Sequence, residues 1–397
     1  MIGFRTGRGI NVLHVAGMFI IVLALSAFRS WGQFEQLADL APGPASGLSL
    51  VNDTAAIGYF DSIVFTGFDG GNPGTYSVCL FNAENYQVST LKSFANCPNA
   101  PRLYMSTGSE AYFSAWEPSS GYEVWETNGT ESGTRRISDI NPGLSGSFPY
   151  QFTWNWGYIY FIAFDGIGAG QHGAELWRIK LGETGPALVK DISPGPGSAF
   201  PLESRETEPQ PAKLVSLSKI LYFAASEPEH GKELWRTDGT ESGTFLVKDI
   251  NPGTDENGNA RSSNPSHLTV VGNVLYFAAD DGVRGTELWK SDGTEAGTTL
   301  VAEIGSGRAG GIAPQETFGR RWIKYGRHMY FSAIDRAHGE ELWRTDGTRP
   351  GTRMVCDIRP GAASSRPQWL TSRVNGVLFA ANDGVHGSEL WITDGIL

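Results

Sequence analysis

The chain has 397 residues, of which 51 are glycine and 18% are charged, and its formal net charge is −11 at pH 7. Aromatic residues make up 12% of it, so it is too apolar and too sparsely charged to be disordered, and many short strands with tight turns suit it better. The acidic balance argues against unspecific nucleic-acid binding, because lysine and arginine must displace the counterions of the phosphates.

Residues 1–32 are predicted to form a secretory signal peptide. Arg5 and Arg8 precede an apolar run over residues 15–27, and this run ends in small residues. The alternative is an uncleaved membrane anchor, because residues 11–28 are almost long enough to span a bilayer. With the peptide removed, we expect a soluble monomer, secreted or at the cell surface, that does not insert into the membrane.

The remaining residues, 33–397, are predicted to form one domain of seven related modules. Six modules contain a Glu-Leu-Trp or Glu-Val-Trp triplet, and a degenerate seventh lies near Cys79, where pairing with Cys97 is left open. The tryptophans of the triplets are spaced by 52, 58, 54, 54 and 48 residues: Trp125, Trp177, Trp235, Trp289, Trp343 and Trp391. This period is typical of propellers, solenoids and arrays. Residues that recur once per module are therefore interpreted as structural.

Each module is predicted to be a blade of an all-β protein. In chain order the blades cover residues 48–97, 98–144, 149–193, 212–250, 265–304, 322–358 and 367–395, the last together with 34–41. In the fifth, turn residues separate four runs of strand-forming residues: 266–271, 274–279, 286–291 and 298–304. Such runs predict a four-stranded antiparallel meander. The second run is apolar on both alternating faces, as a strand covered on both sides must be.

The two ends of the array complement each other. The last module stops after its third run, at residues 391–395, whereas residues 36–43 match the fourth run of another module, residues 246–253. One strand from the start and three from the end would complete a seventh blade and hide the edges of an open array. The sequence therefore predicts a seven-bladed β-propeller of four-stranded antiparallel blades, with its ring closed by an N-terminal strand.

The repeat Glu-Leu-Trp-x-x-Asp-Gly-Thr, at residues 233–240, 287–294 and 341–348, resembles that of the bacterial ELWxxDGT-repeat proteins. The resemblance covers nearly all of the mature chain. It implies an exported or surface protein of propeller shape, in a family without an established activity. The chain departs from the pattern in the third module, where residues 178–182 replace the turn, and in the first, which keeps little of it.

The aspartates of the Asp-Gly-Thr turns are interpreted as turn residues: Asp238, Asp292 and Asp346, with Asn128 in the second module. A short side-chain oxygen there accepts backbone amides two residues on, and the glycine takes the positive φ that the hairpin needs. Calcium is the alternative, although Asn128 would bring no charge to it. We expect no metal and no other cofactor.

Histidine and glutamate also recur before the tryptophan strand. The histidines stand in His-Gly pairs: His172, His230, His338 and His386. Metal ligands must converge on one point, whereas residues placed once per blade are spread around a ring. Both residue types are therefore predicted to pack loops and strands.

Function is expected where the modules differ, and three successive connections are long: residues 196–212, 254–266 and 306–321. They are predicted to lie on one side of one face. The candidate ligand-binding residues of the first and third connections and the strand that follows are Glu203, Glu206, Glu208, Arg320, Arg321, Lys324, Arg327 and His328. Trp154 and Trp369 fall in first strands, which line a propeller channel, where they would stack on sugars or pack between blades.

These features favour a secreted or cell-surface, non-catalytic propeller that binds an extracellular polysaccharide or protein through one loop face. The alternative is a secreted glycoside hydrolase or polysaccharide lyase that uses the carboxylates of the long loops, since the spacing of paired carboxylates depends on the fold. The sequence contains no Gly-x-Ser-x-Gly elbow, no phosphate-binding glycine loop and no Cys-x-x-Cys pair.

Overall fold

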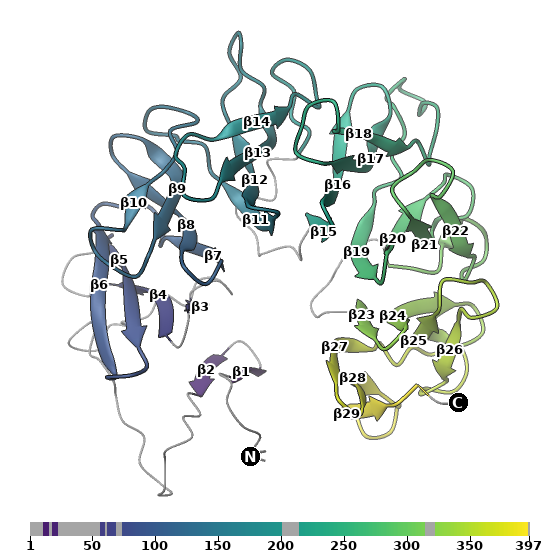
Figure 1. Ribbon diagram of the computed structural model, residues 1–397. Coiled ribbons are helices and arrows are strands. Elements are labelled where there is room, and N and C mark those ends of the chain that lie inside the picture. The colour runs from purple at the N-terminus through teal and green to yellow at the C-terminus, as the bar shows by residue number, and fades with distance from the viewer. Residues whose placement is uncertain are drawn as a thin grey trace, which may run out of the picture. The chain divides into compact units, whose positions relative to one another are not determined.

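The computed structural model describes residues 11–15, 18–22, 56–59, 62–68, 74–200, 214–313 and 322–395 (Figure 1). These residues form strands and turns, with one short 3-10 helix, η2 (Gly307–Ala309), and no α-helix. Among them there is consequently no helix long and apolar enough to cross a membrane. The chain divides into two compact units, residues 1–113 with 127–134, and residues 114–126 with 135–397.

The first unit contains a hairpin and a complete sheet. Strands β1 (Asn11–Val15) and β2 (Met18–Val22) pair antiparallel within the segment predicted as a signal peptide. Blade 1 is a four-stranded antiparallel sheet of β3 (Ala56–Tyr59), β4 (Ser62–Phe68), β5 (Tyr76–Asn82) and β6 (Gln87–Phe94). Cys79 and Cys97 are both buried and are free thiols, so they form no disulfide in this structure.

Blade 2 has the sheet order β10-β9-β8-β7, formed by β7 (Arg102–Ser106), β8 (Ala111–Glu117), β9 (Gly121–Thr127) and β10 (Arg135–Arg136). Blade 3 consists of β11 (Tyr150–Asn155), β12 (Tyr158–Phe164), β13 (Ala174–Lys180) and β14 (Ala187–Lys190). Blade 4 consists of β15 (Val215–Leu217), β16 (Ile220–Glu227), β17 (Gly231–Thr237) and β18 (Phe245–Lys248).

Blade 5 consists of β19 (Ser266–Val271), β20 (Val274–Asp280), β21 (Thr286–Ser291) and β22 (Thr299–Ala302). Blade 6 consists of β23 (Trp322–Tyr325), β24 (His328–Asp335), β25 (Gly339–Thr345) and β26 (Arg353–Cys356). Blade 7 has three strands in the described part of the chain, β27 (Gln368–Arg373), β28 (Gly376–Asn382) and β29 (Ser388–Thr393).

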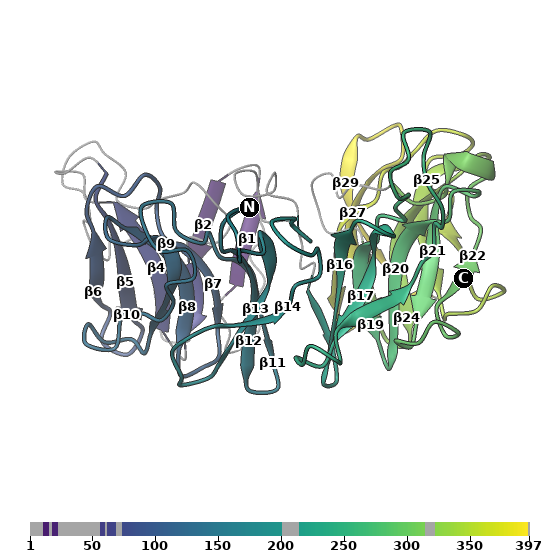
Figure 2. The ribbon, with the colours of Figure 1, turned by 90° about the horizontal axis from the view of Figure 1, so that it is seen from above.

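The sheets agree with the predicted all-β blades. In blade 5 the four strands follow the four predicted runs, except that β22 is shorter than residues 298–304. Figures 1 and 2 show β20 between β19 and β21, as the predicted meander requires. The fourth strand predicted for blade 7, residues 34–41, lies outside the described residues.

The second strand of blade 5 is buried on both faces because its neighbouring blades cover it. In β20, Leu275 and Phe277 pack with Tyr222 of blade 4. The alternate residue Tyr276 packs with Phe331 of blade 6. Burying one phenylalanine or leucine side chain contributes roughly 1.5–3 kcal/mol, so these repeated contacts supply much of the hydrophobic stabilisation of the second unit.

The Asp-Gly-Thr turns also join consecutive blades. Gly293 and Gly347 both have φ +90°, and a Cβ atom on either would lie 2.2 Å from a tyrosine hydroxyl of the preceding blade, that of Tyr222 or Tyr276. Arg236, on the strand beside Tyr222, donates a hydrogen bond to the carbonyl of Gly293 at 3.0 Å. Only glycine fits this contact, because any side chain would overlap the tyrosine and strain the backbone.

Candidate functional site

The aspartates of the repeat are used inside their own turns. Asp238 Oδ1 accepts hydrogen bonds from the backbone N–H and the hydroxyl of Thr240, at 2.9 and 2.7 Å. Asp292 and Asp346 make the same two contacts with the threonine two residues on. The hydroxyl of Thr240 is the main reason why the pKa of Asp238 lies below its usual value.

In each of blades 2 to 6, a buried glutamate accepts hydrogen bonds from the connection that follows the blade. In blade 4, Glu233 Oε2 accepts the N–H of Ile250 at 3.2 Å, and Oε1 accepts the N–H of Ser263 at 2.7 Å. Its counterparts, also 0% exposed, are Glu123, Glu175, Glu287 and Glu341. Because their oxygens are taken up by backbone amides and serine hydroxyls, these carboxylates hold the fold together.

Burial shifts the protonation of these glutamates. It raises the pKa of Glu175 to about 8 and that of Glu233 and Glu287 to about 7, although the N–H and hydroxyl donors pull the pKa values down. No pKa of this kind identifies a catalytic group by itself, because ion and hydrogen-bond networks of a scaffold shift pKa values too.

The recurring histidines close the loop between the second and third strands. In blade 6, His338 donates its backbone N–H to Asp335 Oδ1 at 2.7 Å, and its ring Nδ1 lies 2.8 Å from Asp335 Oδ2. Equivalent ring contacts pair His172 with Asp165, His230 with Glu227, and His386 with Asp383. The histidines are thus paired within their own blades.

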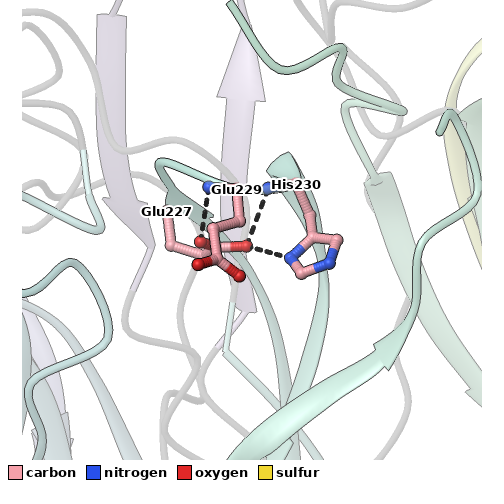
Figure 3. Close-up of side chains that lie close together, drawn as sticks. All are labelled: Glu227, Glu229 and His230. Carbon is pink, nitrogen blue, oxygen red and sulfur yellow. Dashed lines mark hydrogen bonds and ion pairs between the residues drawn. The ribbon is translucent and has the colours of Figure 1, made fainter. Parts of the chain in front are cut away.

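Blade 4 adds a second carboxylate beside this pair (Figure 3). One ligand atom from each of Glu227, Glu229 and His230 lies within 4.8 Å of the others. Glu227 already accepts the backbone N–H groups of Glu229 and His230, at 2.7 and 2.8 Å, and contacts the His230 ring. Since the carboxylate of Glu227 is occupied in this way, the group fits a loop-closing role better than a metal site.

A cavity of about 630 Å³ opens beside blades 4 and 5. It is lined by the connection after β18, by the loop between β20 and β21, and by η2: Asn251, Thr254, Asp255, Glu256, Arg261, Asp280, Gly282, Gly285 and Arg308. Two of the three long connections predicted to carry function therefore meet at one cavity. Its volume falls within the range of ligand pockets, roughly 300–1,000 Å³.

Asn251 forms part of the buried wall of this cavity. Its side chain is 8% exposed, and Nδ2 donates to the carbonyl of Ser262 at 3.1 Å. Its Oδ1 accepts no hydrogen bond from the described residues. It faces Gly282, where a Cβ atom would lie 2.5 Å from this oxygen. A buried acceptor without a partner costs about 1–3 kcal/mol; this oxygen has almost no solvent-accessible surface, so it is a feature of the packing against Gly282 and not a contact point for a ligand.

The charged side chains at the cavity mouth differ in whether other groups of the protein already bind them. Asp255 Oδ1 accepts the N–H groups of Asn257 and Asn259, both at 2.9 Å, within a short hairpin. The exposed guanidinium groups of Arg261 and Arg308 have no ion pair with any described residue. The mouth thus presents two arginines that are available to a ligand.

The predicted ligand-binding residues are only partly accounted for. Five of them lie outside the described residues: Glu203, Glu206, Glu208, Arg320 and Arg321. Lys324 and Arg327 are exposed on the β23–β24 hairpin, and His328 begins β24. The loop face of blade 6 begins after Asp335, at the other end of β24, so the structure does not bring these three residues to the cavity.

The two tryptophans predicted for the channel are half exposed. Trp154 on β11 is 50% exposed and Trp369 on β27 is 46% exposed. Sequence reasoning missed the residues that do line the cavity from shorter loops, Asp280, Gly282 and Gly285. The signal that would have found them is the position of their loop, which lies beside the long connection of the preceding blade.

Comparisons with known proteins find distant likenesses among solved structures. No protein-family model matches the chain, and no curated protein matches it. Among solved structures, a prolyl endopeptidase matches with TM-score 0.43 and 10% identity over 85% of this chain, which spans 49% of the endopeptidase, about half its length.

The β-propeller domain of the Trilobed protease from Pyrococcus furiosus matches with TM-score 0.38 and 12% identity, over 88% of this chain and 96% of that domain. TolB from Acinetobacter baumannii matches with TM-score 0.33 and 11% identity, over 80% of this chain and 77% of TolB. The description of this chain as propeller-like rests on its own sheets.

Proposed function

We propose that the chain is an exported, non-catalytic β-propeller that binds an extracellular polysaccharide in the cavity beside blades 4 and 5. The observation that carries the proposal is that two of the three long connections line this one cavity. Long loops are where repeat proteins vary without disturbing their shared cores. Residues 1–32 and the resemblance to exported repeat proteins support a location outside the cell.

A polysaccharide is favoured over a protein partner by the chemistry of the lining. Energetically dominant protein contacts are enriched in aromatic side chains and arginine seated in packed apolar pockets. Among the described residues, no aromatic or large aliphatic side chain lines the cavity; those that do line it are amide, carboxylate, guanidinium, threonine and glycine.

The test is a glycan binding screen with the mature protein and a loop variant. In the variant, one glycine replaces residues 255–259; the join is short because Thr254 and Ala260 already pair across the base of the hairpin. The control shortens the exposed residues 167–170 in blade 3. Binding lost in the first variant and kept in the second, with both melting like the parent, supports the site. A glycan bound equally by both places the site elsewhere.

We also propose that residues 36–47 complete blade 7 and close the ring. The third strand of blade 7 lacks the cover that its counterparts have, since Leu390 is 75% exposed whereas Leu288 and Leu342 are 0% and 1% exposed. Residues 36–43 match the fourth strand of blade 4 in sequence. A strand paired with β29 would cover this edge, as edges in soluble proteins generally are covered.

The match continues beyond the strand and supplies partners for Glu389. Residues 39–48 align without a gap with residues 191–200 of blade 3. That stretch gives Glu175 three backbone amides, those of Ile192, Ser193 and Ala199. The corresponding donors for Glu389 are the amides of residues 40, 41 and 47. The thiol measurement at the end of the Discussion tests this closure.

A further inference from the structure

We propose that the inner hairpins of blades 3 to 7 bind a strand of an acidic glycan. An inner hairpin is the first strand, the turn after it and the start of the second strand in each of these blades: residues 150–158, 215–220, 266–274, 322–328 and 368–376. The hairpins lie at the other end of the blades from the cavity, because β20 begins at Val274 beside its turn and ends at Asp280, which lines the cavity. The inference therefore adds a second binding surface to the proposed function and does not depend on the cavity.

The inner hairpins form one continuous surface. All five belong to the second unit, and each first strand contacts the first strand of the next blade. Figure 1 shows β11, β15, β19, β23 and β27 along the inner side of these blades. Two hydrogen bonds join neighbouring turns: Trp156 Nε1 donates to the carbonyl of Ser218 at 2.9 Å, and the Tyr325 hydroxyl donates to the carbonyl of Val374 at 3.4 Å.

The charges of the inner hairpins all have one sign. The whole chain has 42 acidic and 31 basic residues, yet the hairpins contain no aspartate and no glutamate. Their charged residues are Lys219, Lys324, Arg327 and Arg373. All four side chains are exposed, and none has an ion pair with a described residue. This surface thus differs from the cavity, where charges of both signs are mixed, and it attracts an anion.

The described carboxylates at this end of the blades lie in the turns between the third and fourth strands, further out than the first strands (Figure 1). They are Asp238, Glu241, Asp292, Glu295 and Asp346. The pKa of Asp346 is lowered mainly by the Thr348 hydroxyl and in part by His328, so His328 is not counted among the free cations. Acidic outer turns therefore border the cationic inner hairpins, and this contrast directs an anionic ligand inward.

The inner hairpin of blade 3 adds an aromatic surface. Trp156 is 59% exposed and has φ 46°, a conformation that is strained for any residue with a side chain. Blades 4 to 6 have Ser218, Gly272 and Gly326 at this turn position. Such strain is characteristic of functional positions. Lys219 Nζ lies 4.6 Å from the centre of the Trp156 ring, so a sugar that stacks on the ring would bring its carboxylate to a cation.

The spacing of the cations favours a polymer over a small anion. They stand on blades 4, 6 and 7, and packed sheets lie about 10 Å apart. One sugar therefore reaches the cations of one blade, whereas a strand of linked sugars contacts several blades at once. Linked contacts raise the overall affinity because each later contact forms within the same complex.

A pair of double variants in blade 6 tests the cations. K324Q with R327Q removes two cations from the inner hairpin and should weaken binding of a galacturonate decamer by about tenfold, since two charged contacts are lost together. R349Q with R353Q is the matched control: it removes two exposed arginines from the turn before β26 and from β26 itself, on the outer side of the same blade. The control should leave the affinity unchanged, and both variants should melt like the parent protein.

The variant Trp156→Gly separates binding from stability. It places in blade 3 the residue that blades 5 and 6 have at this turn position. Glycine adopts positive φ without strain, and this gain offsets the lost hydrogen bond to Ser218. The melting temperature should therefore change little, whereas the decamer should bind several-fold more weakly. A purely structural tryptophan would show the opposite pattern, a lower melting temperature with unchanged binding.

The experiment is isothermal titration calorimetry of the mature protein, at low and high salt, with a galacturonate decamer, a galacturonate dimer and a galactose decamer. We expect the galacturonate decamer to bind and its affinity to fall with salt, because the charges are exposed. The dimer and the neutral decamer should bind at least about tenfold more weakly. Vesicles of phosphatidylcholine and phosphatidylserine in equal parts, and a single-stranded oligothymidylate, are the probes for a membrane and a nucleic acid.

Four results would overturn the inference: unchanged decamer affinity in the K324Q–R327Q variant, equal weakening in the R349Q–R353Q control, tighter binding of the vesicles or the oligothymidylate, or no binding of any probe. The variant that lacks residues 255–259 should bind the decamer like the parent protein. If that variant loses the decamer, the ligand lies in the cavity, so this inference fails and the proposed function stands. If the glycan screen finds no ligand of the cavity while the decamer still binds the hairpins, only the proposed function fails.

Discussion

Blades 5 and 7 contain the same Glu-Leu-Trp strand, and its surroundings differ. In blade 5, Glu287 and Leu288 are 0% exposed. In blade 7, Glu389 is exposed and Leu390 is 75% exposed. The amides that Glu287 accepts belong to Ile304 and Gly305, after the fourth strand. The burial of the motif is thus conferred by the fourth strand and the connection behind it, and the triplet alone does not supply it.

A second difference concerns the contact between blades. The tyrosine that meets the next Asp-Gly-Thr turn is Tyr276 in blade 5, paired across the sheet with Lys290. Lys290 donates to the carbonyl of Gly347 at 2.9 Å. In blade 7 the same two positions are Leu378 and Ile392. Blade 1, which would follow blade 7 in a closed ring, carries no Asp-Gly-Thr turn. Neither the tyrosine–lysine pair nor the Asp-Gly-Thr turn is therefore present where blades 7 and 1 would meet in a closed ring.

The largest effect is expected from removing residues 33–47. If these residues complete blade 7, their loss takes away a ladder of hydrogen bonds and the cover of Leu390 and Ile392, and the free energy of unfolding should fall by several kcal/mol. Denaturant unfolding of the full and shortened mature proteins measures this. Equal unfolding free energies for the two would mean that blade 7 is stable with three strands.

Two alanine substitutions compare the blades directly. Glu287→Ala leaves the buried amides of Ile304 and Gly305 without an acceptor and should cost about 2–4 kcal/mol. Glu389→Ala should cost nearly as much if the N-terminal segment supplies its amides, and should be almost neutral if it does not. Chemical denaturation of both variants separates the two cases.

The buried glutamates also predict a pH dependence. Their pKa values are raised in the folded chain, to about 8 for Glu175 and about 7 for Glu233 and Glu287. The folded state therefore holds these protons more tightly, so the stabilisation is complete below the usual glutamate range, near 4.5, and is lost as pH rises through 7 to 8.

The raised pKa values of His230, His338 and His386, set mainly by their carboxylate partners, act in the same direction. The melting temperature should accordingly be higher at pH 5.5 than at pH 8.5. Glu233→Gln, which fixes that site in a neutral form, should flatten the profile. A melting temperature that does not fall over this interval would contradict the raised pKa values of the buried glutamates.

The smallest effect is expected at the turns. Asp238→Asn keeps the acceptor for Thr240 and should change stability little, whereas Asp238→Ala should cost about 1 kcal/mol, the scale of one lost hydrogen bond. Melting curves with and without calcium provide the measurement. A calcium-dependent rise in melting temperature that both substitutions abolish would favour the calcium alternative.

The sequence predicted the blades because strand runs and turn residues are local. The four runs of blade 5 are found at the expected positions, since hydrophobic alternation and Asp-Gly-Thr turns act over a few residues. The role of Glu233 could not be predicted from the sequence, because its partner Ser263 lies 30 residues later in the chain. The need for glycine at Gly293 could not be predicted either, because the tyrosine that it contacts belongs to the preceding blade.

The site was predictable only in part. Unequal loop lengths identified the connection that contains Asp255 and Arg261, which does line the cavity. Lys324 and His328, which the sequence groups with the third connection, do not line this cavity, since one strand of eight residues, β24, carries the chain to the other end of blade 6; their role in binding stays a prediction. That Asn251 keeps an oxygen without a donor depends on packing against Gly282, which no spacing reveals.

The central claim, that residues 36–47 complete blade 7, is tested most directly by the reactivity of a cysteine at position 390. Leu390→Cys is made in a Cys356→Ser background, because Cys356 is exposed whereas Cys79 and Cys97 are buried, and Leu342→Cys in blade 6 is the control. If the segment covers β29, both cysteines resist a thiol reagent in the mature protein, and only the one at position 390 reacts once residues 33–47 are removed. Equally fast labelling at position 390 with and without the segment would contradict the closed blade.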